Sequence, residues 1–360
     1  MEVREIFSVL NVVKIAGTAT ISFFVAILLT PIWTKVLYKY QLGKQVIRKE
    51  TAPIFSEMHK KKVGTPTMGG VVIWMTVVVI TVMFWALAKL FPGSVFSELN
   101  FLSRAQTWVP LAALIISAIF GLVDDYFGVR RIGPGGGGLK MRDRILMYVL
   151  VGAGLAWWFY VKLGWNFVNI PFLGDMVIGW WYVPFFVFII VASAFSANET
   201  DGLDGLAAGI FLTMFVAYGA IAFDQGRVDL VVFMASIIGA LIAFLWFNIY
   251  PAKFFMGDTG SMSLGVTLGV VAMFTNTPLL LIPIAMIFIV ESGSVIIQLT
   301  SKKLRGKKIF LSTPIHHHFE ALGWHETQVT MRFWMISAIG AIIGLIIFLV
   351  DSKIPAMLFK

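Results

Sequence analysis

The chain contains about ten apolar segments of roughly 20 residues each, the length that an α-helix needs to cross the hydrocarbon core of a bilayer. An ordinary soluble domain is about half apolar, whereas 59% of these 360 residues are hydrophobic. The sequence therefore predicts an all-α polytopic membrane protein with about ten transmembrane helices. We find no separate soluble region, so residues 1–360 are expected to form a single integral-membrane domain.

Positive charge is unevenly distributed over the loops between these segments. The expected segments are 15–38, 69–91, 107–127, 145–163, 177–197, 205–223, 229–247, 261–276, 279–300 and 332–351. Most lysines and arginines fall in one alternate set of loops, and such loops face the cytoplasm. An even number of segments then places both termini on the extracytoplasmic side. This bias accounts for the net charge of +9, and we expect no nucleic-acid partner.

Acidic residues lie at the ends of three segments: Asp124 and Asp125, Asp201 and Asp204, and Asp258. An acid beside bilayer-length apolar sequence is costly unless it faces water, a partner or a metal. The loop alternation places all of them on the cytoplasmic side, so we expect one shared site there. Adjacent carboxylates repel each other, and Mg²⁺, which binds one or two carboxylates together with substrate phosphate, would relieve that repulsion. Solvated acids that merely mark a segment end are the alternative.

Other polar residues gather in the same set of loops. The loop 198–205 holds acids and glycines without a basic residue, which favours a ligand site over a simple turn. Phe255 offers an aromatic ring beside a helix start that attracts phosphate. The histidines at 316–318 suit phosphate contact or proton transfer. The lysines at 60–62 suit phosphate binding, or simply follow the positive-inside bias.

These features together indicate an enzyme rather than a passive membrane protein. One face carries carboxylates for Mg²⁺, basic residues for phosphate, and histidines, and beside it lies the bilayer. The chain has no cysteine, which excludes disulfides, thiolate metal sites and a thiol nucleophile. We therefore expect a phosphorylated, water-soluble donor and a membrane-resident acceptor.

Five motifs occur in a fixed order along the chain between about Lys60 and Arg332. They are Thr65-Pro66-Thr67-Met68-Gly69-Gly70, Thr200-Asp201-Gly202-Leu203-Asp204-Gly205-Leu206-Ala207, Phe244-Leu245-Trp246-Phe247-Asn248, Phe255-Met256-Gly257-Asp258 and Pro314-Ile315-His316-His317-His318. In this combination they resemble the polyprenyl-phosphate N-acetylhexosamine-1-phosphate transferase superfamily. The last motif is most similar to its phospho-N-acetylmuramoyl-pentapeptide transferase branch.

The resemblance implies a reaction in peptidoglycan synthesis at the bacterial cytoplasmic (inner) membrane. UDP-N-acetylmuramoyl-pentapeptide (UDP-MurNAc-pentapeptide) would donate phospho-sugar to undecaprenyl phosphate, giving lipid I and UMP, with Mg²⁺ as cofactor. Direct attack and a covalent aspartyl-phosphate both stay open. The resemblance also allows a homodimer.

The resemblance also implies roles for individual residues. Asp258 would be the Mg²⁺ ligand, with Asp124 and Asp125 close by, and one of that pair would deprotonate or position the lipid phosphate. His317 is assigned to catalysis. The residues implied in donor binding are Lys62, Thr65, Asn198, Asp201, Asn248, Phe255, Gln298, His316 and His318.

Alternatives to this reaction predict different features. A related transferase with another UDP-N-acetylhexosamine would share all the motifs. A transporter predicts acids in mid-helix and inverted repeats, whereas these acids lie at one face, and a lipid-binding scaffold would not need Asp258. Two departures from the family pattern concern donor binding: Phe195 and Glu199 are unusual, and Arg142 and Arg144 stand where lysines are common, with a different donor geometry.

Overall fold

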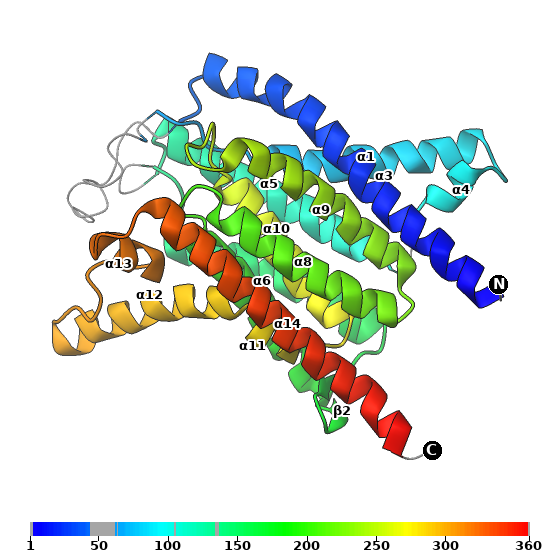
Figure 1. Ribbon diagram of the computed structural model, residues 1–360. Coiled ribbons are helices and arrows are strands. Elements are labelled where there is room, and N and C mark those ends of the chain that lie inside the picture. Colours follow the sequence, from blue (N-terminus) through cyan, green and yellow to red (C-terminus); the bar gives the residue numbers. More distant parts are fainter. Residues whose placement is uncertain (1–2, 44–61, 63, 104–105, 134–136, 359–360) are drawn as a thin grey trace.

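The computed structural model describes residues 3–43, 62, 64–103, 106–133 and 137–358 of the chain. Figure 1 shows its long helices, most of which lie side by side along one common direction, while the light orange helix at the lower left points away from the others. They are α1 (Val3–Lys39), α3 (Val71–Leu90), α5 (Trp108–Arg130), α6 (Met141–Trp157), α7 (Tyr182–Thr200), α8 (Leu206–Asp224), α9 (Val228–Asn248), α10 (Gly257–Phe274), α12 (Met286–Arg305) and α14 (Glu326–Leu358). The structure confirms a mostly helical chain whose long apolar helices are consistent with a polytopic membrane protein.

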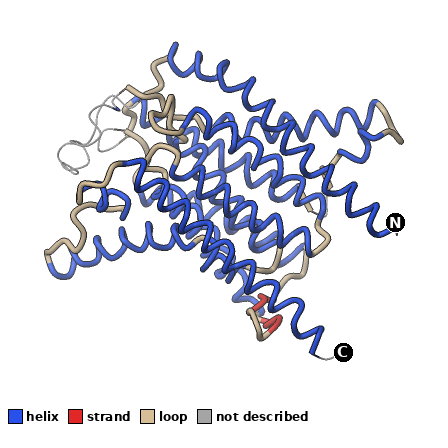
Figure 2. The backbone as a smooth tube through the Cα atoms, in the orientation of Figure 1, coloured by secondary structure: helices blue, strands red, loops and turns tan. Residues whose placement is uncertain are grey.

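Short elements connect the long helices. They are α4 (Val95–Leu99), the π-helical turn η3 (Trp158–Lys162), the strands β1 (Phe167–Ile170) and β2 (Gly174–Val177), the 3₁₀ turns η4 (Gly179–Trp181) and η5 (Pro278–Leu280), and the helices α11 (Leu281–Ile284) and α13 (Ile315–Ala321). The strands form an antiparallel hairpin in which Phe167 faces Val177. Figure 2 shows this hairpin at the end of the bundle where α14 ends.

The number of spans differs from the expected ten. Among the described residues, eight helices are long and apolar enough to cross a membrane, and a helix pair bent by 84° makes a ninth if it is counted as one span. This pair, Pro278–Ile284 and Met286–Arg305, replaces the continuous segment expected over 279–300. Proline lacks a backbone N–H and disrupts a helix interior, so Pro283, close to the break, favours the bend.

The remaining expected segment, 261–276, corresponds to α10 at the centre of the bundle. All of its residues from Thr259 to Phe274 are buried, and it contacts α3, α5, α7 and α8. Two of its hydroxyl groups bond within the helix: Ser263 donates to the Thr259 carbonyl at 2.7 Å and Thr267 to the Ser263 carbonyl at 2.7 Å. Because α10 is surrounded by protein, it tolerates serine, threonine and glycine, and its composition falls short of an apolar span.

The outer helices expose large apolar side chains. On α1, Leu28 is 69% exposed, and Trp246 near the end of α9 is 74% exposed. Extended apolar surfaces of this kind are unfavourable in water and suit a bilayer. Figure 1 shows that α1 begins and α14 ends at one end of the bundle, whereas α13 lies at the other. The polar loops that carry the candidate residues lie at the α13 end.

Candidate active site

Glycine brings the ends of α5 and α10 into close contact. A Cβ atom on Gly121 would lie 2.5 Å from the Asp258 carbonyl carbon and 2.6 Å from the Thr259 Cα atom. Only glycine allows two helix backbones to approach so closely. Asp124 follows Gly121 by one helical turn, so this approach places the α5 aspartates beside the start of α10.

A guanidinium group lies between two of the expected carboxylates. The Arg144 Nε atom is 2.5 Å from Asp124 Oδ2, and one of its terminal nitrogens is 3.2 Å from Asp258 Oδ2. Arg144 also donates to Asn198 Oδ1 at 3.3 Å, and the Asn198 amide nitrogen donates to Asp258 Oδ1. Helices α5, α6, α7 and α10 each contribute one side chain to this cluster. We call these four residues the carboxylate cluster.

Asp125 fixes the start of α10. It is buried and accepts hydrogen bonds from the Thr259 backbone N–H at 3.0 Å and from the Thr67 hydroxyl at 3.3 Å. Asp124, in contrast, accepts the Leu139 backbone N–H at 2.6 Å and pairs with Arg144. The two adjacent aspartates therefore point to different partners, which separates their negative charges.

Asp201 joins the loop 198–205 to the same helix start. Its Oδ2 atom accepts the Gly257 backbone N–H at 2.9 Å. Gly257 has φ of +74°, a conformation that a residue with a Cβ rarely adopts. A Cβ there would also lie 2.5 Å from Asp125 Oδ2. Asp201 is thus bonded to the residue that directly precedes Asp258 in the chain.

Lys62 forms a second cluster with two acids. Its Nζ atom is 2.7 Å from Asp204 Oδ1 and also pairs with Glu326 Oε1. The same Glu326 oxygen accepts the Asp204 backbone N–H at 2.7 Å. The Lys62 ammonium also lies 5.7 Å from the centroid of the Phe255 ring, within cation–π range. We call Lys62, Asp204 and Glu326 the lysine cluster; the neighbouring Lys60 and Lys61 lie outside the described residues.

Two residues implied in donor binding have their amides occupied inside the protein. Asn248 accepts the Gly205 backbone N–H at 3.0 Å and donates to the Phe254 carbonyl at 2.8 Å. Gln298 accepts the Ile309 backbone N–H at 2.9 Å and donates to the Phe310 carbonyl at 2.8 Å. Both side chains are buried. In this structure they hold loops in place, while Phe255 and Thr65 are partly accessible.

The three histidines on α13 have different surroundings. His316 is fully buried and its Nδ1 atom is 2.9 Å from Glu291 Oε2. His317 is nearly buried, with Nδ1 2.7 Å from Glu320 Oε2. His318 is partly exposed and accepts the Leu311 backbone N–H at 3.2 Å. Only His317 and His318 thus have surface through which a substrate could be contacted.

The carboxylate cluster provides donors of the kind that Mg²⁺ prefers. Within the part of the chain that the structure describes, no group of three or more His, Asp or Glu side chains is arranged to hold a metal. Mg²⁺ needs only one or two carboxylates, however, and completes its shell with water and phosphate. Asp124 and Asp258 supply hard oxygen atoms, and Arg144 already places positive charge between them. These oxygen ligands therefore fit Mg²⁺, which would take the place of the Arg144 guanidinium between the two carboxylates.

Three charged residues of this region, two in the clusters and one paired with His316, were not identified as site residues from the sequence. Arg144 was recognised only as a departure from the family pattern, and Glu291 and Glu326 were not assigned. Glu326 lies in the first turn of α14, where an acid is ordinary, and Arg144 lies in a stretch that the positive-inside bias already explains. A buried acid such as Glu291 in an apolar segment is a usable signal, but its partner is visible only in three dimensions.

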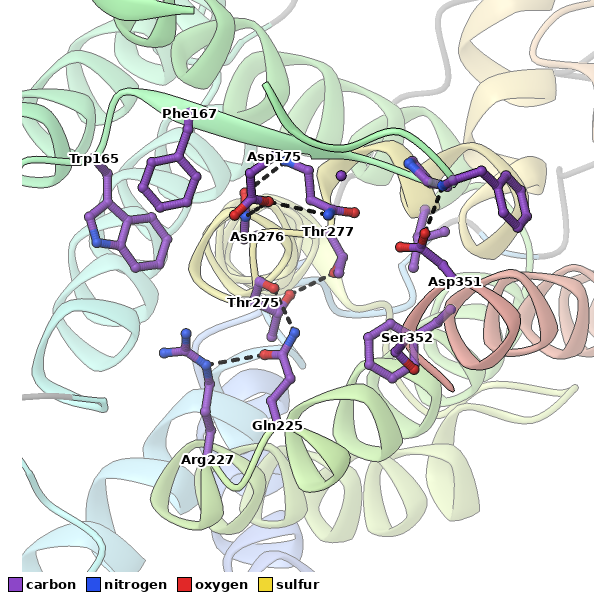
Figure 3. A pocket seen from close by; sticks show the side chains of 16 residues that line it. Trp165, Phe167, Asp175, Gln225, Arg227, Thr275, Asn276, Thr277, Asp351 and Ser352 are labelled. Atoms are coloured by element: carbon purple, nitrogen blue, oxygen red, sulfur yellow. Dashed lines mark hydrogen bonds between the residues drawn. The ribbon is translucent and has the colours of Figure 1, made fainter. Parts of the chain in front are cut away.

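A separate cavity of about 670 Å³ lies at the opposite end of α10, and Figure 3 shows its lining. There Gln225 donates to the Thr275 carbonyl at 2.8 Å and accepts the Arg227 Nε–H at 3.1 Å. Arg227 lies 5.1 Å from the centroid of the Phe274 ring, and burial lowers the pKa of its guanidinium below the usual range. The cavity contains none of the residues expected in the site.

The chain matches models of known families. Residues 107–276 match glycosyl transferase family 4. Residues 62–73, which begin at Lys62, match phospho-N-acetylmuramoyl-pentapeptide-transferase signature 1. The first match includes the whole carboxylate cluster.

The chain is also similar to complete proteins. It is 36% identical over 332 residues to the phospho-N-acetylmuramoyl-pentapeptide-transferase of Geobacillus thermodenitrificans, which covers 91% of this chain and 95% of the relative. The protein of the same name from Listeria monocytogenes is 36% identical over 341 residues, covering 93% and 98%. That of Chloroflexus aggregans is 37% identical over 340 residues, covering 91% and 87%.

Proposed function

The chain belongs to the phospho-N-acetylmuramoyl-pentapeptide-transferase family, and from that premise we propose that it transfers phospho-MurNAc-pentapeptide from UDP-MurNAc-pentapeptide to undecaprenyl phosphate. The products are lipid I and UMP. The observation that carries the proposal is the carboxylate cluster, in which Arg144 bridges Asp124 and Asp258 beside the lysine cluster. Acids and cations in this density suit a reaction between two phosphorylated substrates.

In the proposed reaction, a phosphate oxygen of the lipid attacks the sugar-linked phosphorus of the donor. One P–O bond forms there, and the bond from that phosphorus to the UMP oxygen breaks. Lys62 and Arg144 offset negative charge on the diphosphate and on the departing UMP. Because Asp125 is engaged in holding the start of α10, we assign to Asp124 the acceptance of a proton from the lipid phosphate.

Mg²⁺ is proposed as the cofactor, held by Asp258 and Asp124, with Asp125 nearby. Bound there, it would neutralise charge that develops on the phosphoryl oxygens. Thr65, Phe255 and His318 are partly exposed, and His317 keeps 7% of its side-chain surface exposed. We propose that they contact the donor, with Asn198 and Asp201 shaping the loop beneath it.

The membrane placement is part of the proposal. We place the site on the cytoplasmic side of a bacterial cytoplasmic membrane, and the excess of lysine and arginine in one set of loops supports that side. Because the proposed donor is water-soluble, the site must open to water on that side. The outward-facing apolar side chains of the outer helices would contact lipid.

The test is a reconstituted reaction. Purified protein in detergent receives UDP-MurNAc-pentapeptide, undecaprenyl phosphate and Mg²⁺, and UMP and the lipid product are quantified. We expect UMP release that needs the acceptor lipid and Mg²⁺. Release with UDP-N-acetylglucosamine but not with the pentapeptide donor would favour a related transferase instead. Absence of UMP release with either donor, from protein that unfolds cooperatively on heating, would refute the proposal.

A further inference from the structure

A fully buried acid–histidine pair lies under the loop 198–205. Glu291 on α12 and His316 on α13 have no exposed side-chain surface, and the Nδ1–Oε2 distance is 2.9 Å. A buried carboxylate is costly unless it is paired and hydrogen-bonded. The pair therefore ties α13 to the bent helix α12 at a fixed position, whichever of the two carries the proton.

The imidazole of His316 packs directly against the backbone of Gly202. A Cβ on Gly202 would lie 2.7 Å from the His316 Cε1 atom, closer than two carbon atoms can approach. The His317 ring lies edge-on, with its centroid 4.0 Å from that of His316. The His316 ring thus supports the loop from below, and the orientation of the ring determines the position of the Gly202 backbone.

The same loop carries residues of both clusters. Asp201 precedes Gly202 and accepts the Gly257 backbone N–H, next to Asp258. Asp204 follows it and pairs with Lys62. Just before the loop, the Ser196 hydroxyl donates to the Ser292 hydroxyl at 2.9 Å, which joins α7 to α12 beside Glu291.

We propose that Glu291 and His316 are positioning residues, and that His316 does not contact the substrate. Glu291 holds the imidazole in one orientation, and the imidazole supports Gly202, so that Asp201 and Asp204 stay aligned with Asp258 and Lys62. This inference rests on the proposed function, because the alignment of these four residues matters only for the proposed transfer reaction. It gives His316 a positioning role in place of the donor contact that the family resemblance implied. It also gives a role to Glu291, which the resemblance did not assign.

The first test compares two substitutions of Glu291. Glu291→Ala removes the partner of His316 and should lower kcat/KM for the donor on the order of 10- to 100-fold, because misplacement of a site by about 1 Å costs about 100-fold. Glu291→Gln keeps an oxygen and a similar shape, and should recover most of that loss. If both variants keep wild-type kcat and donor KM, the positioning role is wrong. Gly293→Ala on the same helix is the control, since a Cβ there meets nothing within 4 Å.

The second test uses the contact itself. Gly202→Ala forces a methyl group onto the imidazole, whereas Gly202→Ala combined with His316→Ala gives that methyl group space. We expect the double variant to unfold at a higher temperature than Gly202→Ala alone and to be at least as active as His316→Ala alone. A double variant that unfolds no higher than Gly202→Ala alone would refute the contact, and one that is clearly less active than His316→Ala alone would refute the positioning role. The unfolding temperatures need no turnover, so they test the contact even if the proposed reaction fails.

Discussion

The close approach of α5 to α10 makes a sharp prediction for Gly121→Ala. The new Cβ would lie 2.5 Å from the Asp258 carbonyl carbon and 2.6 Å from the Thr259 Cα atom. Carbon atoms are in comfortable contact at about 3.5 Å, so the two helices must separate locally by about 1 Å. The neighbours of the new atom are backbone, which cannot rotate away as a side chain can.

The expected effect is large on turnover and moderate on stability. A shift of about 1 Å at reacting groups costs on the order of 100-fold in rate, because Asp258 would move away from Asp124 and Arg144. Overpacking a core typically costs about 1–3 kcal/mol, and the better helix propensity of alanine offsets about 0.5–1 kcal/mol of that. Gly121→Ala should therefore fold, with a lower unfolding temperature and kcat reduced about 100-fold.

The assay is UMP release, measured beside the thermal unfolding of the same purified samples. Gly154→Ala on α6 is the matched control: a Cβ there meets nothing within 4 Å, and the variant should keep wild-type turnover. A Gly121→Ala protein with kcat close to wild type would show that the spacing of α5 and α10 does not set the site.

Three further predictions concern the roles of Lys62, Asn248 and Phe255. Lys62→Met leaves Asp204 and Glu326 as an uncompensated acidic pair, so it should cost about 3 kcal/mol of stability. Adding Glu326→Gln should restore part of the lost unfolding temperature. An unfolding temperature that does not rise in the double variant would contradict the ion-pair account. Asn248→Ala strands the Gly205 N–H and the Phe254 carbonyl and should cost about 1–3 kcal/mol, seen as a lower unfolding temperature; a raised donor KM at unchanged stability would instead show that Asn248 contacts the donor. Phe255→Ala should show the reverse pattern, with donor KM raised several-fold and the unfolding temperature nearly unchanged, and a purely thermal effect would count against a donor contact.

Much of the architecture could be predicted from the sequence because lipid imposes a simple rule. A segment that crosses a bilayer must be apolar for about 20 residues, and this length located most of the long helices. The rule failed where protein replaces lipid: α10 is buried by its neighbours, so its serines and threonines are tolerated. It also failed at the bend of 84° between α11 and α12, because hydropathy says nothing about the direction of a helix.

The aspartates and Lys62 of the candidate site could be predicted from the sequence, whereas Arg144, Glu326 and Glu291 could not. Aspartates beside apolar segments are conspicuous because their burial is costly, and the structure brings Asp124, Asp201 and Asp258 to one end of the bundle. Arg144 looked like one more cytoplasmic positive charge, since its partners lie on other helices. For the same reason, the sequence could not show that the Asn248 and Gln298 amides are used by nearby backbone groups.

The most direct test of the central claim follows the two phosphorus atoms of the donor. UDP-MurNAc-pentapeptide is prepared with a label only in the sugar-linked phosphate and incubated with the protein, undecaprenyl phosphate and Mg²⁺. Transfer of phospho-sugar predicts that the label enters the lipid product, in equal amount to the unlabelled UMP released, and that Asp258→Asn abolishes both. Label recovered in UDP would show transfer of the sugar without its phosphate, and would contradict the proposed reaction.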